Sequence, residues 1–271
     1  MKKPISFMLC IVMILTCLPM VSWAAEDSTV TLDVGLGRIA ITADGYRIYG
    51  DTTDHAILEK THRGSYILTG TADANCVGDN QAYVTVENTT GVAITMKDLK
   101  IVIPETTSAA AFTVGSAGHD KVTVDLTLEG TNVLTSGKNN NGLTMPEYSV
   151  LNIDGIGSLT CTGGSGNEDG FGIYGESINV SGGTVQAFSG KIAATTDDPT
   201  DHYIGNCGLW AGNNLKVSGT GSVTGKAGAV KGANVLSYGI ACTGDITVTN
   251  AGSISGEGGR TEGSESSYSA G

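Results

Sequence analysis

Cations, aromatic residues and prolines are all scarce in this sequence. Its 271 residues include 15 Lys and Arg against 27 Asp and Glu, 5 prolines and 6% aromatic side chains. The resulting net charge of −12 repels phosphate backbones, and binding to nucleic acid depends mainly on cationic contacts. The sequence also lacks a basic amphipathic stretch of the kind that lies on an anionic membrane surface. We therefore expect no nucleic-acid partner.

The one long apolar run lies at the start of the chain. Lys2 and Lys3 precede an apolar stretch over residues 5–21, and Ser22 and Ala24 then supply the small residues that a signal peptidase reads. We predict a signal peptide over residues 1–24, no membrane span in the mature chain, and a secreted or cell-surface protein. A retained membrane anchor is the competing interpretation. Removal of two lysines leaves 13 cations against 27 anions, a net charge of −14.

Cysteines at the spacing of a disulfide framework are missing as well. Two of the six cysteines lie in the predicted signal peptide, and the others are Cys76, Cys161, Cys207 and Cys242. In the fold predicted below, Cys207 and Cys242 occupy positions about four residues, or ~13 Å, apart along a strand. A disulfide does not span that distance. We expect thiols, most of them buried.

A repeat dominates the rest of the sequence. Five segments alternate two apolar residues with polar ones, place Gly or Asn at the fifth position, and add an apolar residue at the eighth or ninth: 126–134, 151–159, 178–185, 215–223 and 246–254. Period-two alternation predicts a strand with one buried face. Gly and Asn tolerate positive φ and therefore mark a bend. Each segment predicts two short strands joined by a tight corner.

A second signature supplies a third strand for each repeat. A glycine followed by an aliphatic residue recurs ahead of the last four segments, and the four aliphatic residues are Leu143, Ile173, Leu209 and Ile240. The segments begin at intervals of 25, 27, 37 and 31 residues, which suits a three-sided coil with corners of variable length. We predict that the four aliphatic residues stack in one inward column, ~4.8 Å apart. The predicted fold class is all-β, a parallel β-helix (solenoid) with three short strands per coil.

The predicted β-helix covers residues 82–260. Residues 25–81 are a looser β region that forms the first coils and covers the open end. Residues 261–271 are a polar tail, and Ser267-Tyr268 matches Ser237-Tyr238 ahead of a third strand, so the tail is either a cap or a truncated further coil. A β-sandwich does not repeat one bend at one phase, and propeller blades are longer and richer in aromatic residues, so both folds are disfavoured.

Two of the segments resemble a known family. The runs over residues 126–137 and 151–164 resemble repeats of secreted, pectate-lyase-like right-handed parallel β-helix proteins of gut and soil bacteria, often labelled carbohydrate-binding domain proteins or adhesin-like surface proteins. The resemblance covers about residues 82–260. It implies a right-handed coil, and the family's labels suggest a module that binds a glycan or cell-surface polysaccharide, or is adhesive or structural. The shared residues are structural and do not define an activity.

Aromatic residues provide the candidate ligand-binding site. Tyr174 follows Gly172 by two residues and Trp210 follows Gly208 by two, which places both rings in one outward column on adjacent coils. Phe171 and Tyr203 lie near them in the sequence. A pair of rings edged by polar groups is what a sugar-stacking platform requires. The alternative interpretation is that the stacked rings only stabilise the sheet.

Acidic residues in the longest interval are the other candidate site. Asp197, Asp198 and Asp201 offer oxygen ligands for Ca²⁺, and a pair of carboxylates is also what a glycoside hydrolase needs. However, Lys191 is the only cation near them in the sequence, so the clamp expected of an enzyme on acidic polysaccharide is missing. We favour a solvated loop with no catalysis, cofactor or metal, and keep a polysaccharide lyase or glycoside hydrolase as the alternative.

Overall fold

The computed structural model describes residues 28–50, 55–87, 89, 91–115, 121–167, 170–193, 205–231, 236–262 and 268–270. These residues form strands, turns and two short 3₁₀ helices, η1 (Val34–Leu36) and η2 (Ala74–Cys76), and they contain no α-helix. None of their helices has the length and apolarity to span a bilayer. The all-β class predicted from the sequence is confirmed.

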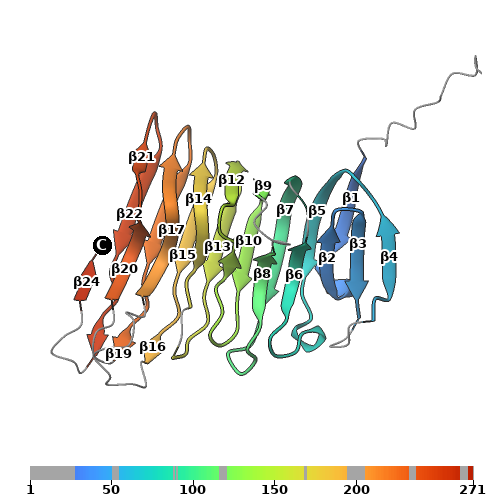
Figure 1. Ribbon diagram of the computed structural model, residues 1–271, viewed down its shortest axis with the longest axis horizontal. Coiled ribbons are helices and arrows are strands. Elements are labelled where there is room, and N and C mark those ends of the chain that lie inside the picture. The colour runs from blue at the N-terminus through green and yellow to red at the C-terminus, as the bar shows by residue number, and fades with distance from the viewer. Residues whose placement is uncertain are drawn as a thin grey trace, which may run out of the picture.

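From β5 on, the described strands follow the chain order along the long axis of the molecule, whereas β4 and β3 lie outermost at the N-terminal end (Figure 1). Those of the N-terminal part are β1 (Thr29–Asp33), β2 (Arg38–Thr42), β3 (Gly45–Tyr49), β4 (Leu58–Thr61), β5 (Ser65–Thr71), β6 (Ala82–Glu87), β7 (Gly91–Val102) and β8 (Ala110–Val114). The central ones are β9 (Thr123–Glu129), β10 (Thr131–Thr135), β11 (Leu143–Thr144), β12 (Val150–Gly155), β13 (Ser158–Thr162), β14 (Ile173–Val180), β15 (Thr184–Phe188) and β16 (Ile192–Ala193). The C-terminal ones are β17 (Gly205–Val217), β18 (Ser222–Lys226), β19 (Val230–Lys231), β20 (Leu236–Cys242), β21 (Ile246–Val248), β22 (Ser253–Glu257), β23 (Thr261–Glu262) and β24 (Tyr268–Ala270).

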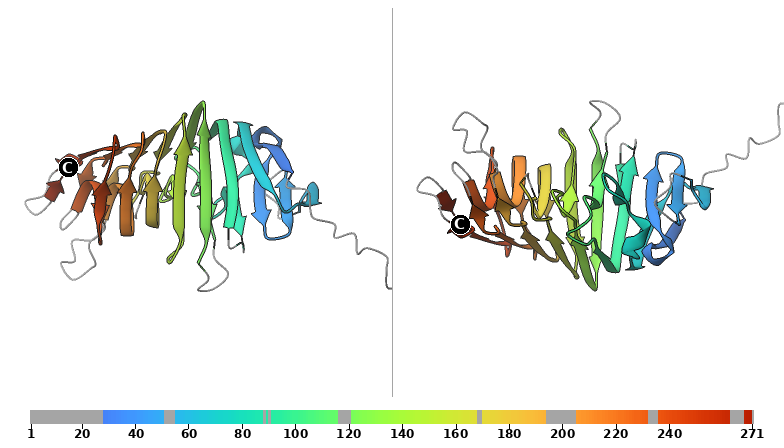
Figure 2. Two further views of the ribbon diagram at one scale, coloured as in Figure 1. Left: turned by 90° about the horizontal axis from the view of Figure 1, so that it is seen from above. Right: turned by 90° about the horizontal axis from the view of Figure 1, so that it is seen from below.

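Nearly all neighbouring strands are parallel, and they line up in three ladders along the molecule (Figure 2). The first ladder is β2–β6–β8–β11–β14–β17–β20–β24. The second is β1–β5–β7–β9–β12–β14–β17–β21. The third is β7–β10–β13–β15–β18–β22. A separate three-stranded sheet, β16–β19–β23, lies beside them.

The predicted inward column is present in the first ladder. Leu143 pairs with Ile173, Ile173 with Leu209, and Leu209 with Ile240. The first three side chains are fully buried. Ile240 is half-buried because the last strand of the ladder, β24, pairs only with Leu236–Tyr238 and does not reach it. The column that the sequence predicted is therefore confirmed.

The register of the first repeat segment was predicted wrongly. Leu126 pairs with Ile153, whereas Val124 pairs with Leu151. The segment therefore begins two residues earlier than its sequence suggested, and the first interval is 27 residues. The later predicted intervals of 27, 37 and 31 residues are confirmed, because they equal the separations of the paired residues.

A buried asparagine explains this error. Asn132 occupies the inward position opposite Leu159, where the repeat calls for an aliphatic residue. Its Oδ1 accepts a hydrogen bond from the Leu99 backbone N–H, and its Nδ2 donates to the carbonyls of Glu129 and Ser158. The side chain is thus satisfied inside the core, and a pattern of apolar residues cannot locate it.

Positive φ angles mark the predicted bends. They occur at the fifth position of four segments, and at the sixth position of the third, shorter segment: Gly130 (64°), Gly155 (111°), Gly219 (59°), Asn250 (60°) and Gly183 (71°). The prediction is confirmed in four segments and wrong by one residue at Gly182. Glycine and asparagine adopt positive φ with little strain, which explains their recurrence at these bends.

The cysteines are thiols, as predicted. Cys76, Cys161 and Cys207 are buried, and Cys242 is half-buried. Cys242 pairs with Ala211, which is four residues along β17 from Cys207, so these two thiols are not juxtaposed. Burial raises the pKa of the Cys161 thiol far above its ordinary value.

The two ends of the molecule differ. At the N-terminal end, β3 pairs antiparallel with β2 and β4, while the parallel pairing already begins at β1 and β5. At the C-terminal end, β24 continues the first ladder on β20 and places Ala270, not Tyr268, opposite Tyr238. The strand expected in the tail exists, but its register is shifted by two residues from the match between the two Ser-Tyr pairs.

Candidate functional site

The first ladder positions the predicted aromatic pair. Tyr174 in β14 pairs directly with Trp210 in β17, between Thr144 on one side and Ala241 on the other. Their chain neighbours Ile173 and Leu209 are fully buried, whereas Tyr174 and Trp210 are each half-buried. The two rings therefore lie on the outer face of adjacent strands, as the sequence indicated.

Phe171 joins these two residues in one aromatic cluster. Its ring centroid lies 5.6 Å from that of Tyr174 and 6.1 Å from that of Trp210, with interplanar angles of 15° and 23°. Only 5% of Phe171 is exposed, so this residue serves as the packed member of the cluster. The surface that remains for a ligand belongs to Tyr174 and Trp210. Tyr203, the fourth predicted binding residue, lies outside the described residues.

A groove of about 400 Å³ lies where the small sheet meets the turns before it. We call it the lysine groove, because Lys138, Lys191 and Lys231 line it. Its other lining residues are Glu105, Ser165, Gly166, Asn167, Ile192, Ala193, Ala229 and Val230. Ile192 pairs with Val230, and Gly166 bridges to Ile192, so the lining comes from successive layers of parallel strands. The groove thus combines an apolar floor with cationic walls.

Ser165 and Gly166 hold the groove together. The Ser165 hydroxyl donates to Glu105 Oε1 and accepts from the Lys191 backbone N–H, at 3.2 Å in both cases. Gly166 has no side chain for a steric reason: a Cβ there would lie 1.5 Å from Oδ1 of Asn139. That same Oδ1 accepts from the backbone N–H of Asn167 at 3.1 Å. These hydrogen bonds fix the backbone of the groove around Ser165 and Lys191.

The charge of the groove is opposite to that of the chain. Lys138, Lys191 and Lys231 are exposed, and none of them forms an ion pair with another residue of the described part. Glu105 is the one carboxylate among the lining residues that belong to the described ranges, and Glu168 and Asp169, which follow Asn167 in the sequence, lie outside those ranges. In a chain with a net charge of −12, these three described lysines create a local positive potential that would attract an anion.

The lysine groove and the aromatic cluster share one turn. Lys138 lies in this turn, and three residues later Asn141 accepts a hydrogen bond through Oδ1 from the Phe171 backbone N–H at 2.9 Å. The next described residue after Ala193 of the groove is Gly205, the first residue of β17, which is the strand that carries Trp210. Local hydrogen bonding therefore links the two sites.

The acidic candidate residues lie between Ala193 and Gly205 in the sequence. Asp197, Asp198 and Asp201 lie outside the described residues, so their proposed roles in Ca²⁺ binding or catalysis remain predictions. Within the described ranges, no group of three or more His, Cys, Asp or Glu side chains has the arrangement of a metal site.

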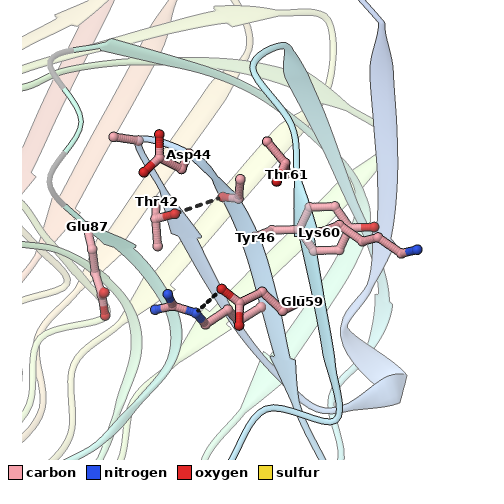
Figure 3. A pocket seen from close by; sticks show the side chains of 10 residues that line it. Thr42, Asp44, Tyr46, Glu59, Lys60, Thr61 and Glu87 are labelled. Atoms are coloured by element: carbon pink, nitrogen blue, oxygen red, sulfur yellow. Dashed lines mark hydrogen bonds and ion pairs between the residues drawn. The ribbon is translucent and has the colours of Figure 1, made fainter.

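A second pocket, of about 300 Å³, lies at the N-terminal end (Figure 3). The turn between β2 and β3 lines it together with β4 and Glu87. Arg47 Nε lies 3.2 Å from Glu59 Oε1, and Asp44 pairs with Arg63 at 3.4 Å. Arg47 and Arg63 neutralise Glu59 and Asp44 within the antiparallel end, so we assign this pocket a structural role.

Sequence reasoning missed the lysine groove. It noted Lys191 but did not connect it with Lys138 or Lys231, which are separated from it by tens of residues. A signal was present: the tripeptide Ser-Gly-Lys occurs at residues 136–138 and again at 189–191. This recurrence places Lys138 and Lys191 at the same position of two coils, and therefore on the same side of the molecule.

Comparison of the chain with family models, curated proteins and solved structures finds no match.

Proposed function

We propose that the three ladders are the sides of a right-handed parallel β-helix of the pectate-lyase-like kind, with three short strands per coil. The chain visits the first, second and third ladders in that order and then returns to the first. Each time the chain returns to the first ladder, it has moved along the stack by one strand spacing. Right-handedness follows from the strong preference of parallel strands in one sheet for right-handed connections.

We propose further that this β-helix is a secreted or cell-surface module that binds carbohydrate without catalysis. The observation that carries the proposal is the lysine groove beside the aromatic cluster. The apolar floor and the half-buried rings of Tyr174 and Trp210 suit the apolar faces of sugar rings. Lysine ammonium groups donate hydrogen bonds to hydroxyls and, more strongly, to carboxylates.

The arrangement of the lysines favours an acidic polysaccharide. They stand on layers whose spacing is ~4.8 Å, so a polymer lying along the stack would meet cations at repeated steps. A chain of net charge −12 repels polyanions elsewhere, and the groove supplies the local attraction.

A lyase or hydrolase acting on the same polymer is the second candidate, because the groove supplies the cationic clamp that such an enzyme would use. Hydrolysis, however, requires two positioned carboxylates. Among the lining residues that the structure describes, Glu105 is the one carboxylate, and it accepts a hydrogen bond from Ser165. We therefore propose binding without turnover. New reducing ends or unsaturated products after incubation with polygalacturonate would overturn that choice.

The binding proposal is tested with polygalacturonate and a neutral β-glucan as ligands. In calorimetry, the combined substitution Lys138→Ala and Lys191→Ala is expected to weaken polygalacturonate binding by about tenfold or more, because charge-assisted hydrogen bonds are lost. Trp210→Ala is expected to weaken binding of both polymers. Lys97→Ala is the matched control, because Lys97 pairs with Glu129 on another face.

Two results would contradict the proposal. One is a wild-type chain that binds neither polymer. The other is polygalacturonate binding that Lys138→Ala, Lys191→Ala and Trp210→Ala all leave unchanged.

A further inference from the structure

A column of residues beside the lysine groove runs through successive layers of the stack. The same backbone hydrogen bond joins each layer to the next, with the N–H of one residue donating to the carbonyl of another: Asn139 to Ser165, Gly166 to Lys191, Ile192 to Ala229, and Val230 to Arg260. The residue ahead of each donor therefore shares a column with the acceptor of that bond. The column consists of Lys138, Ser165, Lys191, Ala229 and Arg260.

Cations occupy every second layer of this column. Lys138, Lys191 and Arg260 are exposed, and none of them forms an ion pair with another residue of the described ranges. We call these three residues the cation row. Because neighbouring strands lie ~4.8 Å apart, successive members of the row stand ~9.6 Å apart. Arg260 carries the row one layer beyond the residues that line the lysine groove.

The layers between the cations suit a sugar without charge. The Ser165 hydroxyl donates to Glu105 Oε1, so a carboxylate stands beside this layer and would repel a second one. Ala229 presents a methyl group to the groove. A neutral sugar can donate a hydroxyl or amide hydrogen bond to Glu105 and rest its apolar face on Ala229.

Lys231 is a cation of the groove that lies outside the row. It stands at the layer of Ala229 but two residues further along the strand, ~6.6 Å away. Its register partner one layer further on is Glu262. A polymer aligned with the cation row therefore passes Lys231 at one side.

We propose that the cation row selects an acidic polysaccharide in which a uronate alternates with a neutral sugar. This inference rests on the carbohydrate-binding function proposed above and names the class of its ligand. One pyranose ring advances an extended polysaccharide by about one strand spacing, so a polymer lying along the row brings every second sugar to a cation. Each uronate carboxylate then receives charge-assisted hydrogen bonds from Lys138, Lys191 or Arg260. In a polymer made only of uronates, every other carboxylate would face Glu105 or Ala229 instead.

Calorimetry with two oligosaccharides of equal ring number tests the selection. Hyaluronate has one carboxylate for every two sugars, and polygalacturonate has one on each. We expect the wild-type chain to bind hyaluronate about tenfold more tightly. Attraction by charge alone gives the opposite order, because polygalacturonate carries twice the charge.

Loss of one cation tests the row itself. Arg260→Ala is expected to weaken hyaluronate binding roughly tenfold, because the charge-assisted hydrogen bonds to one uronate are lost. Lys216→Ala is the matched control. Lys216 is an exposed cation in the second ladder, where it pairs with Asn179, and its removal should leave hyaluronate binding unchanged.

A gain of charge tests the alternation. Ala229→Lys places cations on three successive layers of the column, so the carboxylates of polygalacturonate are then matched at each of these layers. We expect the preference for hyaluronate over polygalacturonate to fall about tenfold. Thermal unfolding of the three variants shows whether each change is confined to the surface.

A wild-type chain that binds polygalacturonate at least as tightly as hyaluronate would overturn the selection. So would a preference that Arg260→Ala and Ala229→Lys both leave unchanged. If Lys138→Ala and Lys191→Ala still weaken polygalacturonate binding in those cases, the carbohydrate-binding function stands without the selection. A chain that binds neither acidic polymer would instead contradict that function itself.

Discussion

At the scale of single residues, a few buried polar side chains define the core as firmly as the aliphatic ones do. Asn132 interrupts an inward column that continues through Leu159, Val185, Val223 and Ile254. Its hydrogen bonds join one backbone group of its own layer, at Glu129, to one in each neighbouring layer, at Leu99 and Ser158. Removal of one partner from a buried hydrogen bond costs more than the bond contributes, because the other partner is left desolvated.

Asn132→Ala is therefore expected to lower the free energy of unfolding by about 2–4 kcal/mol. The substitution strands the Leu99 N–H and the Glu129 and Ser158 carbonyls inside the core. Asn152→Ala is the control: this side chain bonds Asp125 and Asn179 on the outer face, where water replaces it, and the loss should stay below about 1 kcal/mol. Urea denaturation measures both. Equal losses would contradict the assignment.

The sequence predicted the aliphatic residues of the core but not the lysine groove. Leu143, Ile173 and Leu209 occupy the same position of successive repeats. Because that position is buried, it is apolar in each repeat and can be recognised in the sequence. Lys138 and Lys191 share the tripeptide Ser-Gly-Lys, but two copies are too few to define a repeat, and Lys231 lies outside that tripeptide. The register of the strands is what brings all three lysines together.

At the scale of elements, glycines control how closely the sides of the stack approach. A Cβ on Gly142, Gly172, Gly208 or Gly239 would lie within 3 Å of backbone atoms of another strand. One of the two inward columns of the third ladder also loses side-chain volume toward the C-terminal end, in the order Ile101, Leu134, Cys161, Ala187, Gly225 and Gly256. The sequence showed where the glycines recur, but not that they permit this close contact.

Gly172→Ala tests this role. Its Cβ would lie 2.4 Å from the Phe188 backbone nitrogen and 2.7 Å from the Gly208 carbonyl oxygen, so the backbone must shift. We expect a loss of about 3 kcal/mol in the free energy of unfolding. Gly91→Ala is the control, because its nearest neighbour, the Thr123 carbonyl oxygen, is 3.9 Å away. Comparable stability of the two variants would argue against close packing at Gly172.

At the scale of the whole molecule, each layer contacts mainly the layer before it and the layer after it. Stability in such a stack is approximately a sum of layer terms and interface terms, so an end layer with one neighbour opens more easily than an inner one. The sequence predicted this stacking and the loose end regions, but not the antiparallel closure by β3 and β4.

Hydrogen exchange would show the difference between layers. The amides of β12 and β13, which have a layer on each side, should exchange most slowly among the ladder strands. Uniform protection across all layers would contradict the layered description.

The corners between strands differ in length while the register stays fixed. Ile178 and Leu215 pair across an interval of 37 residues, whereas Leu151 and Ile178 pair across 27. Extra chain is thus absorbed outside the ladders. Corners of variable length are consequently where descendants of such a gene can acquire new epitopes without having to reinvent the scaffold that displays them.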